Sequence, residues 1–566
     1  MGGLFHRFRP EGSAGDGPAG EWSIPIPTKG ARVRRHRLHL PGSLHLLGSL
    51  LLVAATGLFT SGAAPAPAPV EPRPLAQVIP APASVTEAGP PYRITGTTGI
   101  RVGDSPAARA AGEYLADLLR PATGYPLPVT RHGAGGIRLR LAHDGPYGAE
   151  GYRLDSGPAG ITLTAARPAG LFHGVQTLRQ LLPAAVEEDT VQPGPWPVAG
   201  GTIRDTPRYP WRGAMLDVAR HFFTVDEVKR YVDRLALYKF NKLHLHLSDD
   251  QGWRIAVDSW PRLAEYGGST EVGGGPGGHY TKEQYREIVR YAAARHLEVV
   301  PEIDMPGHTH AALASYAELN CDGVAPPLYT GTAVGFSSLC VPKEVTYDFV
   351  DDVIRELAAL TPGRYLHIGG DEAHSTSHAD YARFMERVQP VVARYGKTVV
   401  GWHQLTGASP ARGALAQYWG LDRTSDEEKA EVAKAARSGT GIILSPADRV
   451  YLDMKYDRTT PLGLSWAGYV EVKRSYDWDP GSYLPGVPQD AVRGVEAPLW
   501  TETIENSAHI DHMAFPRLPG VAELGWSPAA THDWEDYRTR LAAQAPRWDA
   551  LGIGYHRSPQ VDWPAA

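Results

Sequence analysis

The sequence predicts a (β/α)8 barrel preceded by a small α/β domain. From Trp211 onward, eight short apolar segments alternate with helical segments over about 300 residues, which is the order of elements in such a barrel. An open doubly wound sheet would alternate in the same way. That fold is expected to carry a glycine-rich phosphate-binding turn after its first strand, and the sequence contains no such turn.

The composition is that of a large globular protein. The 566 residues suggest two to four domains, and 42% of them are hydrophobic, which is enough for a sizeable core. Lysine and arginine total 56 against 62 acidic residues, so we expect no nucleic-acid partner, which would require a basic excess. The 14 tryptophans and 26 tyrosines suit the apolar faces of sugars, although large cores also contain many aromatic rings.

The N-terminal residues predict export. Four arginines between residues 32 and 37 precede the apolar run Leu46–Phe59, and small residues follow at 61–64. This is the order of a secretory signal peptide, and the run is short for a membrane span. We expect residues 1–63 to be an N-terminal extension and signal, with translation starting near Val33, and residues 64–74 to be a Pro/Ala-rich spacer. The protein is then secreted, without stable membrane insertion after signal cleavage.

Residues 75–200 predict the small α/β domain with its linker. Ile137–Ala142 and Ile161–Ala165 have the pattern of strands, whereas Ala107–Leu119 and Pro168–Leu182 have helical apolar spacing. The segment Val186–Gly200, rich in acidic residues, proline and glycine, is interpreted as the linker. Residues 201–566 are assigned to the barrel.

The barrel strands are predicted from apolar segments, and several helices between them from their start signals. Thr224 and Thr281 each begin a capping box, with Glu227 and Gln284 three residues later. The eight predicted strands are Trp211–Asp217, Lys242–Ser248, Leu297–Ile303, Tyr365–Gly369, Thr398–Trp402, Leu415–Trp419, Gly441–Leu444 and Val492–Trp500.

Two adjacent carboxylates, Asp371 and Glu372, follow the fourth predicted strand in the stretch RYLHIGGDEAH. Paired glycines just before them provide more backbone freedom than a simple surface turn needs. The alternative is an acidic helix start, in which either carboxylate favours the helix dipole. In a barrel the active site lies at the carboxyl ends of the strands, so the other strand ends test the two interpretations.

Carboxylates and tryptophans gather at these strand ends, as a sugar site would require. In strand order, the residues are Arg220; Asp249; Glu302, Asp304 and His308; Asp371 and Glu372; Trp402; Trp419; Tyr451 and Asp453; and Trp500 and Glu502. We therefore favour a site over a helix start.

Several separate motifs in the right order resemble the family 20 glycoside hydrolases, the β-N-acetylhexosaminidases, and above all the secreted bacterial members. The motifs are HIGGDEAH, RGAMLDVARHFF (Arg212–Phe223), HLHLSDDQGWR (His244–Arg254), PEIDMPGH (Pro301–His308) and Trp500-x-Glu502. The resemblance covers the chain from about Leu75 to the C-terminus. It implies exo-acting, retaining hydrolysis of terminal β-linked GlcNAc from oligosaccharides such as chitin fragments, and it leaves open whether GalNAc is tolerated.

The resemblance also implies a substrate-assisted mechanism, an exception among glycosidases in which the 2-acetamido group of the sugar is the nucleophile. Glu372 would be the general acid and later the base. Asp371 would hold the acetamido N–H and support the oxazolinium charge, and Tyr451 would orient the acetamido carbonyl.

The same resemblance assigns the binding residues. The tryptophans Trp402, Trp419 and Trp500 would form the cage for the acetyl methyl group, with core packing as the alternative for each. Arg220 and Glu502 would hold the 3- and 4-hydroxyls, and Asp453 and Trp466 would lie near the 4- and 6-hydroxyls; Arg220 is otherwise a structural ion-pair partner. Asp249 and His308 would orient Glu372 and set its pKa.

No cofactor is expected, and the expected partner is an oligosaccharide. Cys321 and Cys340 are expected to pair in an exported protein and would be free thiols in a cytosolic one. His244-x-His246 has the spacing of a metal pair, and equally of barrel packing. The rival functions are therefore metal-dependent hydrolysis and a sugar-binding module without turnover.

Overall fold

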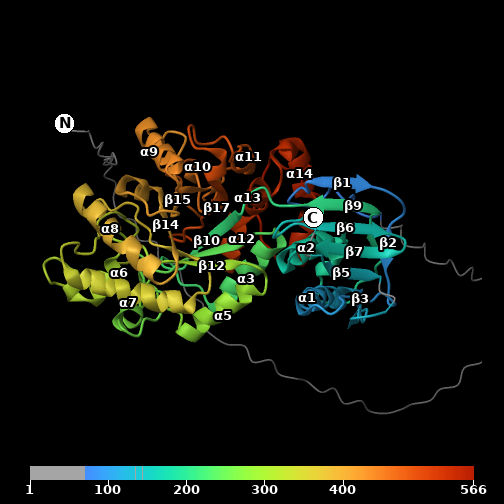
Figure 1. The fold of residues 1–566 in the computed structure, drawn as a ribbon, viewed down its shortest axis with the longest axis horizontal. Helices are drawn as coiled ribbons and strands as arrows, with labels where there is room; N and C mark the ends of the chain where they lie inside the picture. The colour runs from blue at the N-terminus through green and yellow to red at the C-terminus, as the bar shows by residue number, and fades with distance from the viewer. Residues whose placement is uncertain (1–70, 134–135, 143–144, 566) are drawn as a thin grey trace, which may run out of the picture. The chain divides into compact units, whose positions relative to one another are not determined.

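The computed structural model describes residues 71–133, 136–142 and 145–565. Its larger part is a closed barrel of eight parallel strands, β10 to β17, in sequential order (Figure 1). The predicted (β/α)8 fold is thus confirmed. The strands are β10 (Trp211–Asp217), β11 (Lys242–His246), β12 (Glu298–Glu302), β13 (Tyr365–His367), β14 (Thr398–Trp402), β15 (Leu415–Tyr418), β16 (Gly441–Leu444) and β17 (Val492–Ala497).

Helices surround this barrel, and both predicted capping boxes are present. The side chains of Thr224 and Glu227 bond reciprocally at the start of α3, as those of Thr281 and Gln284 do at α5. The helices are α3 (Val225–Leu237), α4 (Arg262–Glu265), α5 (Lys282–Ala293), α6 (His310–Ser315), α7 (Glu344–Leu360), α8 (His378–Arg394), α9 (Asp426–Arg437), α10 (Ala447–Val450), α11 (Val472–Tyr476), α12 (Ser507–Ala514), α13 (Arg517–Trp526), α14 (Trp534–Ala542) and α15 (Ala545–Ala550).

A seven-stranded sheet of order β1-β9-β6-β7-β5-β3-β4 precedes the barrel, with α1 (Pro106–Thr123) and α2 (Pro168–Leu181) packed on it (Figure 1). The predicted strands and helices of this region are therefore present. The sheet strands are β1 (Ser84–Glu87), β3 (Ile100–Arg101), β4 (Val129–Thr130), β5 (Ile137–Leu141), β6 (Tyr152–Gly157), β7 (Gly160–Ala165) and β9 (Gly201–Asp205).

Two segments differ from the prediction. The predicted linker Val186–Gly200 contains a strand, β8 (Trp196–Val198), which pairs with β2 (Tyr92–Ile94). Residues 201–205, assigned from sequence to the barrel, form β9 and pair with β1 and β6 of the first sheet. Proline and glycine around these short strands make them hard to predict, and their partners lie at least 45 residues away in the chain.

Buried ion pairs join this sheet to the barrel. Arg212 of β10 donates to Glu150 Oε1 at 2.6 Å, and its side chain is fully buried. Lys239, which follows α3, lies 3.1 Å from Asp205 of β9, and neither side chain is exposed. Buried charges of this kind are tolerated only when they are paired and hydrogen-bonded.

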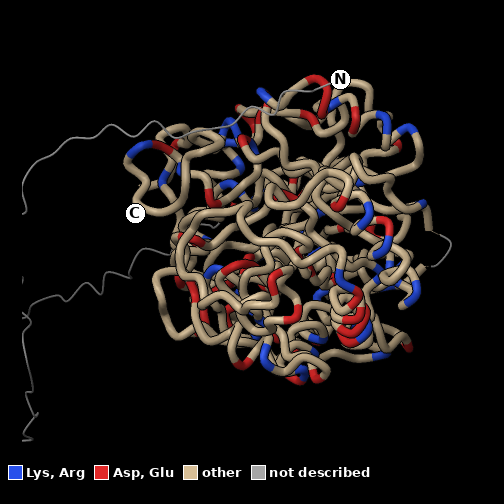
Figure 2. The backbone as a smooth tube through the Cα atoms, turned by 90° about the vertical axis from the view of Figure 1, so that its left-hand side faces the viewer, with Lys and Arg blue, Asp and Glu red and all other residues tan. Residues whose placement is uncertain are grey.

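The disulfide that the sequence suggests for an exported protein is present between Cys321 and Cys340, which are 19 residues apart. It closes the loop between α6 and α7. The predicted signal and most of the spacer lie outside the described residues. No helix within the described ranges is long and apolar enough to cross a lipid bilayer. Basic and acidic residues are intermixed along this part of the chain (Figure 2).

Candidate active site

The predicted catalytic and binding residues lie at the end of a barrel strand or after it, and these strand ends share one face of the barrel. Arg220 follows β10, Asp249 follows β11, and His308 follows β12. The remaining predicted residues follow or end the other strands: Asp371 and Glu372 (β13), Trp402 (β14), Trp419 (β15), Tyr451, Asp453 and Trp466 (β16), and Trp500 and Glu502 (β17).

The two glycines after β13 allow Asp304 to approach the chain closely. Gly369 and Gly370 have φ values of +63° and +101°, which favour glycine. A Cβ atom on Gly369 would lie 1.7 Å from Asp304 Oδ1, so no other residue fits without rearrangement. The Gly370 amide donates to the same oxygen at 2.9 Å. The glycines therefore fix the path of the chain just before Asp371.

We predict that Gly369→Ala lowers kcat by at least about tenfold, because small displacements of catalytic groups are enough for such losses. Gly396→Ala is the matched control: its φ is +74°, but its Cβ would meet no atom within 4 Å. That control should lose about 1 kcal/mol of stability and keep its activity. Steady-state kinetics and thermal unfolding measure both effects, and equal losses of kcat would contradict the prediction.

Glu372 is the more accessible carboxylate of the pair, with a side chain that is 28% exposed. It does not start a helix, because α8 begins after the N-cap Ser377. Its Oε2 lies 3.4 Å from His308 Nε2, and Nδ1 of the same ring lies 3.1 Å from Asp249 Oδ1. Burial disfavours the charged imidazole, but Asp249 and Asp371 raise the pKa of His308 well above its ordinary value. Glu372 thus faces a cationic donor.

Asp371 points into a more enclosed environment, where its side chain is only 9% exposed. Burial raises the pKa of this carboxyl, and His308, whose Nε2 lies 3.7 Å from Asp371 Oδ2, acts in the opposite direction. The two neighbouring carboxylates therefore occupy different environments, one accessible and one enclosed, as two different chemical roles require.

Aromatic rings cluster near Asp371, whose charge acts on the Tyr451 phenol. Trp402 and Trp500 have ring centroids 5.8 Å apart, and Tyr451 is 6.3 Å from Trp500. Trp402 is fully buried and donates its indole N–H to Glu302, whereas Trp419 is only partly buried at the edge of this cluster. The rings form an apolar group at the strand ends. Trp402 and Trp500 also pack as core residues.

Tyr451 lies close to both carboxylates of the pair. Its side chain is buried, and the pKa of its phenol is raised well above the ordinary value, first by burial and then by the charge of Asp371. The phenol therefore stays protonated and can donate a hydrogen bond. Trp466, 43% exposed, contacts Tyr451 and Trp419 edge-on, with centroids 5.9 and 6.0 Å away.

Charged residues occupy the side of the site that belongs to β10 and β17. Arg220 Nη1 lies 2.9 Å from Asp249 Oδ2, so the structural ion pair considered from sequence is present. Its guanidinium also lies over the Trp500 ring, 4.7 Å from the centroid. The buried oxygens Asp453 Oδ2 and Glu502 Oε2 accept no hydrogen bond from any residue that the structure describes. They are placed to accept hydrogen bonds from hydroxyl groups.

A buried hydrogen-bond network of histidines and carboxylates lies below the site, and the sequence did not predict it. From Asp249 it continues through His246 (2.7 Å) to Glu302 (2.5 Å), then to His244 (2.9 Å) and Glu496 (2.7 Å). The alternation in HLHL contains the signal, because it directs both histidines to the same side of β11. Atoms of this network that could bind a metal lie within 4.8 Å of one another in groups of three residues, a spacing that suits a metal ion. Both ring nitrogens of each histidine are already hydrogen-bonded to carboxylates, so we assign these two histidines to the network.

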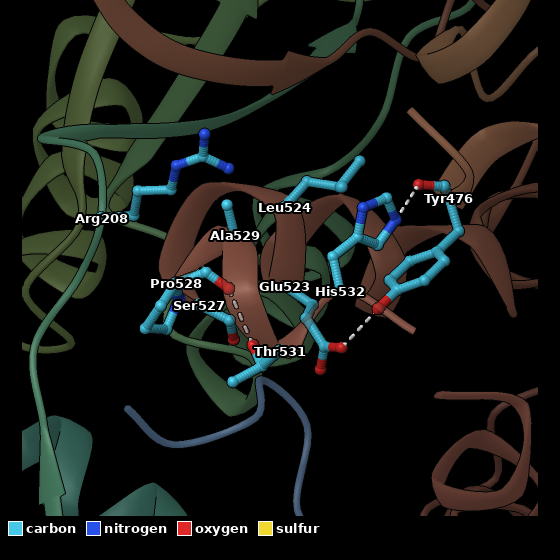
Figure 3. A pocket seen from close by; sticks show the side chains of 9 residues that line it. All are labelled: Arg208, Tyr476, Glu523, Leu524, Ser527, Pro528, Ala529, Thr531 and His532. Atoms are coloured by element: carbon cyan, nitrogen blue, oxygen red, sulfur yellow. Dashed lines mark hydrogen bonds between the residues drawn. The ribbon is translucent and has the colours of Figure 1, made fainter. Parts of the chain in front are cut away.

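A small cavity lies near the amino end of β10, away from the strand ends that carry the site. It is lined by Arg208, Tyr476, Glu523 and His532, among others (Figure 3). Its polar groups are paired: Tyr476 donates to Glu523 at 2.9 Å, and His532 Nε2 lies 3.0 Å from the Tyr476 carbonyl. These contacts connect α11, α13 and the loop before α14, which is a structural role.

Breaking a glycosidic bond requires a proton for the bridging oxygen, and holding a sugar requires apolar surfaces for its faces and polar groups for its hydroxyls. Glu372 can supply the proton, and the indole rings and free carboxylate oxygens provide the two kinds of surface. The fold and the site together define a glycoside hydrolase.

Comparison with known proteins identifies the family. Residues 209–529 match the model of the glycosyl hydrolase family 20 catalytic domain, and residues 75–206 match that of domain 2 of the same family. A β-N-acetylhexosaminidase of Cellulomonas fimi is 44% identical over 492 residues, which are 86% of this chain and 97% of that protein. The chain belongs to glycosyl hydrolase family 20.

Solved structures of β-hexosaminidases are also similar to this chain. A mutant β-hexosaminidase of Streptomyces plicatus in complex with the product GlcNAc is 79% identical, with a TM-score of 0.87, over 88% of this chain and 99% of that one. The family 20 β-N-acetylhexosaminidase of Streptomyces coelicolor A3(2) is 78% identical, also with a TM-score of 0.87, over 88% and 100% of the two chains.

Proposed function

We propose that this glycoside hydrolase is an exo-acting, retaining β-N-acetylhexosaminidase that removes terminal GlcNAc from β-linked oligosaccharides by substrate-assisted catalysis. The observation that carries the proposal is the unequal environment of the adjacent carboxylates, with Glu372 accessible and Asp371 enclosed beside aromatic rings. The names of the relatives, β-N-acetylhexosaminidase and β-hexosaminidase, support the same activity.

Glu372 acts first as the general acid. It protonates the leaving oxygen, and His308 and Asp249 hold its carboxyl group in place. Once the leaving group has departed, the same carboxylate activates a water molecule. Retention then follows from two displacements at the anomeric carbon, the first by the acetamido oxygen and the second by water.

Asp371 and Tyr451 position the acetamido group. Asp371 accepts the acetamido N–H and supports the positive charge of the oxazolinium ion, while the Tyr451 phenol donates to the acetamido oxygen. The ring cluster of Trp402, Trp419 and Trp500 encloses the methyl group. Holding the nucleophile near the anomeric carbon replaces an unfavourable bimolecular encounter, which is a large rate effect.

Recognition of a terminal sugar explains exo action. Arg220 and Glu502 would bind the 3- and 4-hydroxyls, and Asp453 and Trp466 would lie near the 4- and 6-hydroxyls. The unpaired oxygens of Asp453 and Glu502 support this assignment, because buried acceptors favour a ligand with matching donors. A sugar substituted at these hydroxyls would not fit, so the site takes the non-reducing end.

The test compares p-nitrophenyl β-glycosides of GlcNAc, GalNAc and glucose. We expect kcat/KM for the GlcNAc substrate to exceed that for the glucoside by at least about 1,000-fold, because the glucoside lacks the internal nucleophile. A thiazoline that mimics the oxazolinium ion should inhibit tightly. Equal cleavage of the glucoside and the GlcNAc substrate would refute substrate assistance.

The rival functions give other outcomes in the same assays. A sugar-binding module would release no p-nitrophenol from any of the three substrates. Metal-dependent hydrolysis would be lost on chelation and restored by zinc. We also propose that the protein is secreted, which the disulfide between Cys321 and Cys340 supports because such bonds persist in oxidising compartments.

A further inference from the structure

Asp304, at the end of β12, is a buried carboxylate to which the mechanism above gives no role. Its Oδ1 accepts the Gly370 amide at 2.9 Å. Its Oδ2 and Asp371 Oδ1 are both buried, and neither accepts a hydrogen bond from an N–H or O–H donor elsewhere in the described chain. One oxygen of each carboxyl group lies within 4.8 Å of the other group, and the charge of Asp371 raises the pKa of Asp304. Each of these two neighbouring side chains thus has a buried oxygen that lacks a hydrogen bond.

Two buried carboxylates so close to each other cannot both be ionised, because their repulsion is not screened by water. A single proton between them removes the repulsion and satisfies both free oxygens. Paired carboxyl groups of this kind titrate as a unit in two steps.

The surroundings determine which residue holds the proton. Asp304 faces the carboxylates of Asp371 and Glu302, the imidazoles of His246 and His308, and the phenol of Tyr381. Burial, followed by the charge of Asp371, raises the pKa of Asp304 well above its ordinary value. Asp371 has the cationic His308 at 3.7 Å, which stabilises its charged form. The proton therefore belongs to Asp304.

We propose that Asp304 is a positioning residue, which remains protonated and donates its Oδ2–H to Asp371 Oδ1. This bond orients the Asp371 carboxylate and keeps it ionised, so that it can accept the acetamido N–H of the substrate. The proposal rests on the role of Asp371 given under Proposed function. It also accounts for the glycines after β13, since a side chain at residue 369 would displace Asp304 Oδ1.

Two substitutions separate a proton donor from a negative charge at this position. Asp304→Asn reproduces the protonated acid, with an amide oxygen for the Gly370 N–H and an amide N–H for Asp371. Asp304→Leu has a similar volume and no donor. We expect Asp304→Leu to lower kcat about 100-fold or more with little change in KM, as for the loss of one preorganised donor. The kcat of Asp304→Asn should be at least about tenfold higher than that of Asp304→Leu, because the amide keeps a donor.

Infrared difference spectroscopy tests the proton directly and without substrate. The wild-type spectrum minus that of Asp304→Asn should contain the carbonyl stretch of a protonated carboxylic acid at the pH of the assay. Absence of that band, or an Asn variant as impaired as the Leu variant, would overturn the proposal. This measurement does not involve turnover. Its result is therefore independent of the N-acetyl preference measured with aryl glycosides, and failure of this proposal can be distinguished from failure of the proposed function.

A cation between the carboxyl groups is the alternative to a proton. Ligand atoms of Asp304, His308 and Asp371 lie within 4.8 Å of one another. Elemental analysis of the purified full-length enzyme, before and after dialysis against EDTA, distinguishes the two. A stoichiometric metal whose removal abolishes activity would overturn the proposal, whereas a metal-free enzyme of full activity supports it.

Discussion

Glu372→Gln should lower kcat by about 10² to 10⁴-fold on an oligosaccharide or another substrate with a poor leaving group. The amide keeps the size of the side chain and a contact to His308 but has no proton to give. With a very good leaving group, the first step needs little acid assistance and should slow much less. Single-turnover kinetics on aryl glycosides of graded leaving-group pKa measure the difference.

A constant loss across all leaving groups would exclude the acid role of Glu372. Glu427→Gln is a suitable control, because it makes the same chemical change on an exposed turn of α9. That control should have wild-type kcat and KM. A comparable loss in the control would point to an effect on folding rather than on proton transfer.

Asp371→Asn should lower kcat by about 10² to 10³-fold while changing KM little, because the charge that it removes stabilises the transition state more than the bound substrate. The amide would place an N–H group where the acetamido N–H needs an acceptor. It would also leave the cationic His308, now 3.7 Å from an Asp371 carboxylate oxygen, beside a neutral group.

The residual activity of Asp371→Asn on the aryl glucoside provides its internal control. That substrate has no acetamido group, so the substitution should change its slow hydrolysis by much less than it changes hydrolysis of the GlcNAc substrate. An effect confined to KM, or an equal effect on both substrates, would contradict a role for Asp371 in positioning the acetamido group.

The barrel and the position of its site could be predicted because both depend on short local segments of the sequence. Each barrel strand is a short apolar segment, and three of them, such as Thr398–Trp402, have the predicted bounds. Because a parallel barrel brings all carboxyl ends to one face, identifying the strands also placed residues as distant as Arg220 and Glu502 in one site.

The remaining features depend on contacts between distant segments. Strand β9 is recognised only through its pairing with β1 and β6, and its five residues carry no strong strand pattern. Asp304 was noted at a strand end, but nothing in the sequence indicates that its carboxyl group lies close to that of Asp371. Hydrogen-bond partners and protonation states are set by tertiary structure, which a single sequence does not specify.

The pairing of Arg212 with Glu150, and of Lys239 with Asp205, makes the catalytic barrel dependent on the residues that precede it in the chain. A fragment beginning near residue 207 would retain every catalytic side chain but would lose the carboxylate partners of Arg212 and Lys239 and the residues that cover them. Removing one partner of a buried ion pair is strongly destabilising. The barrel is therefore expected to be unstable as an independent catalytic module, because the first sheet supplies the counterions of two of its cations.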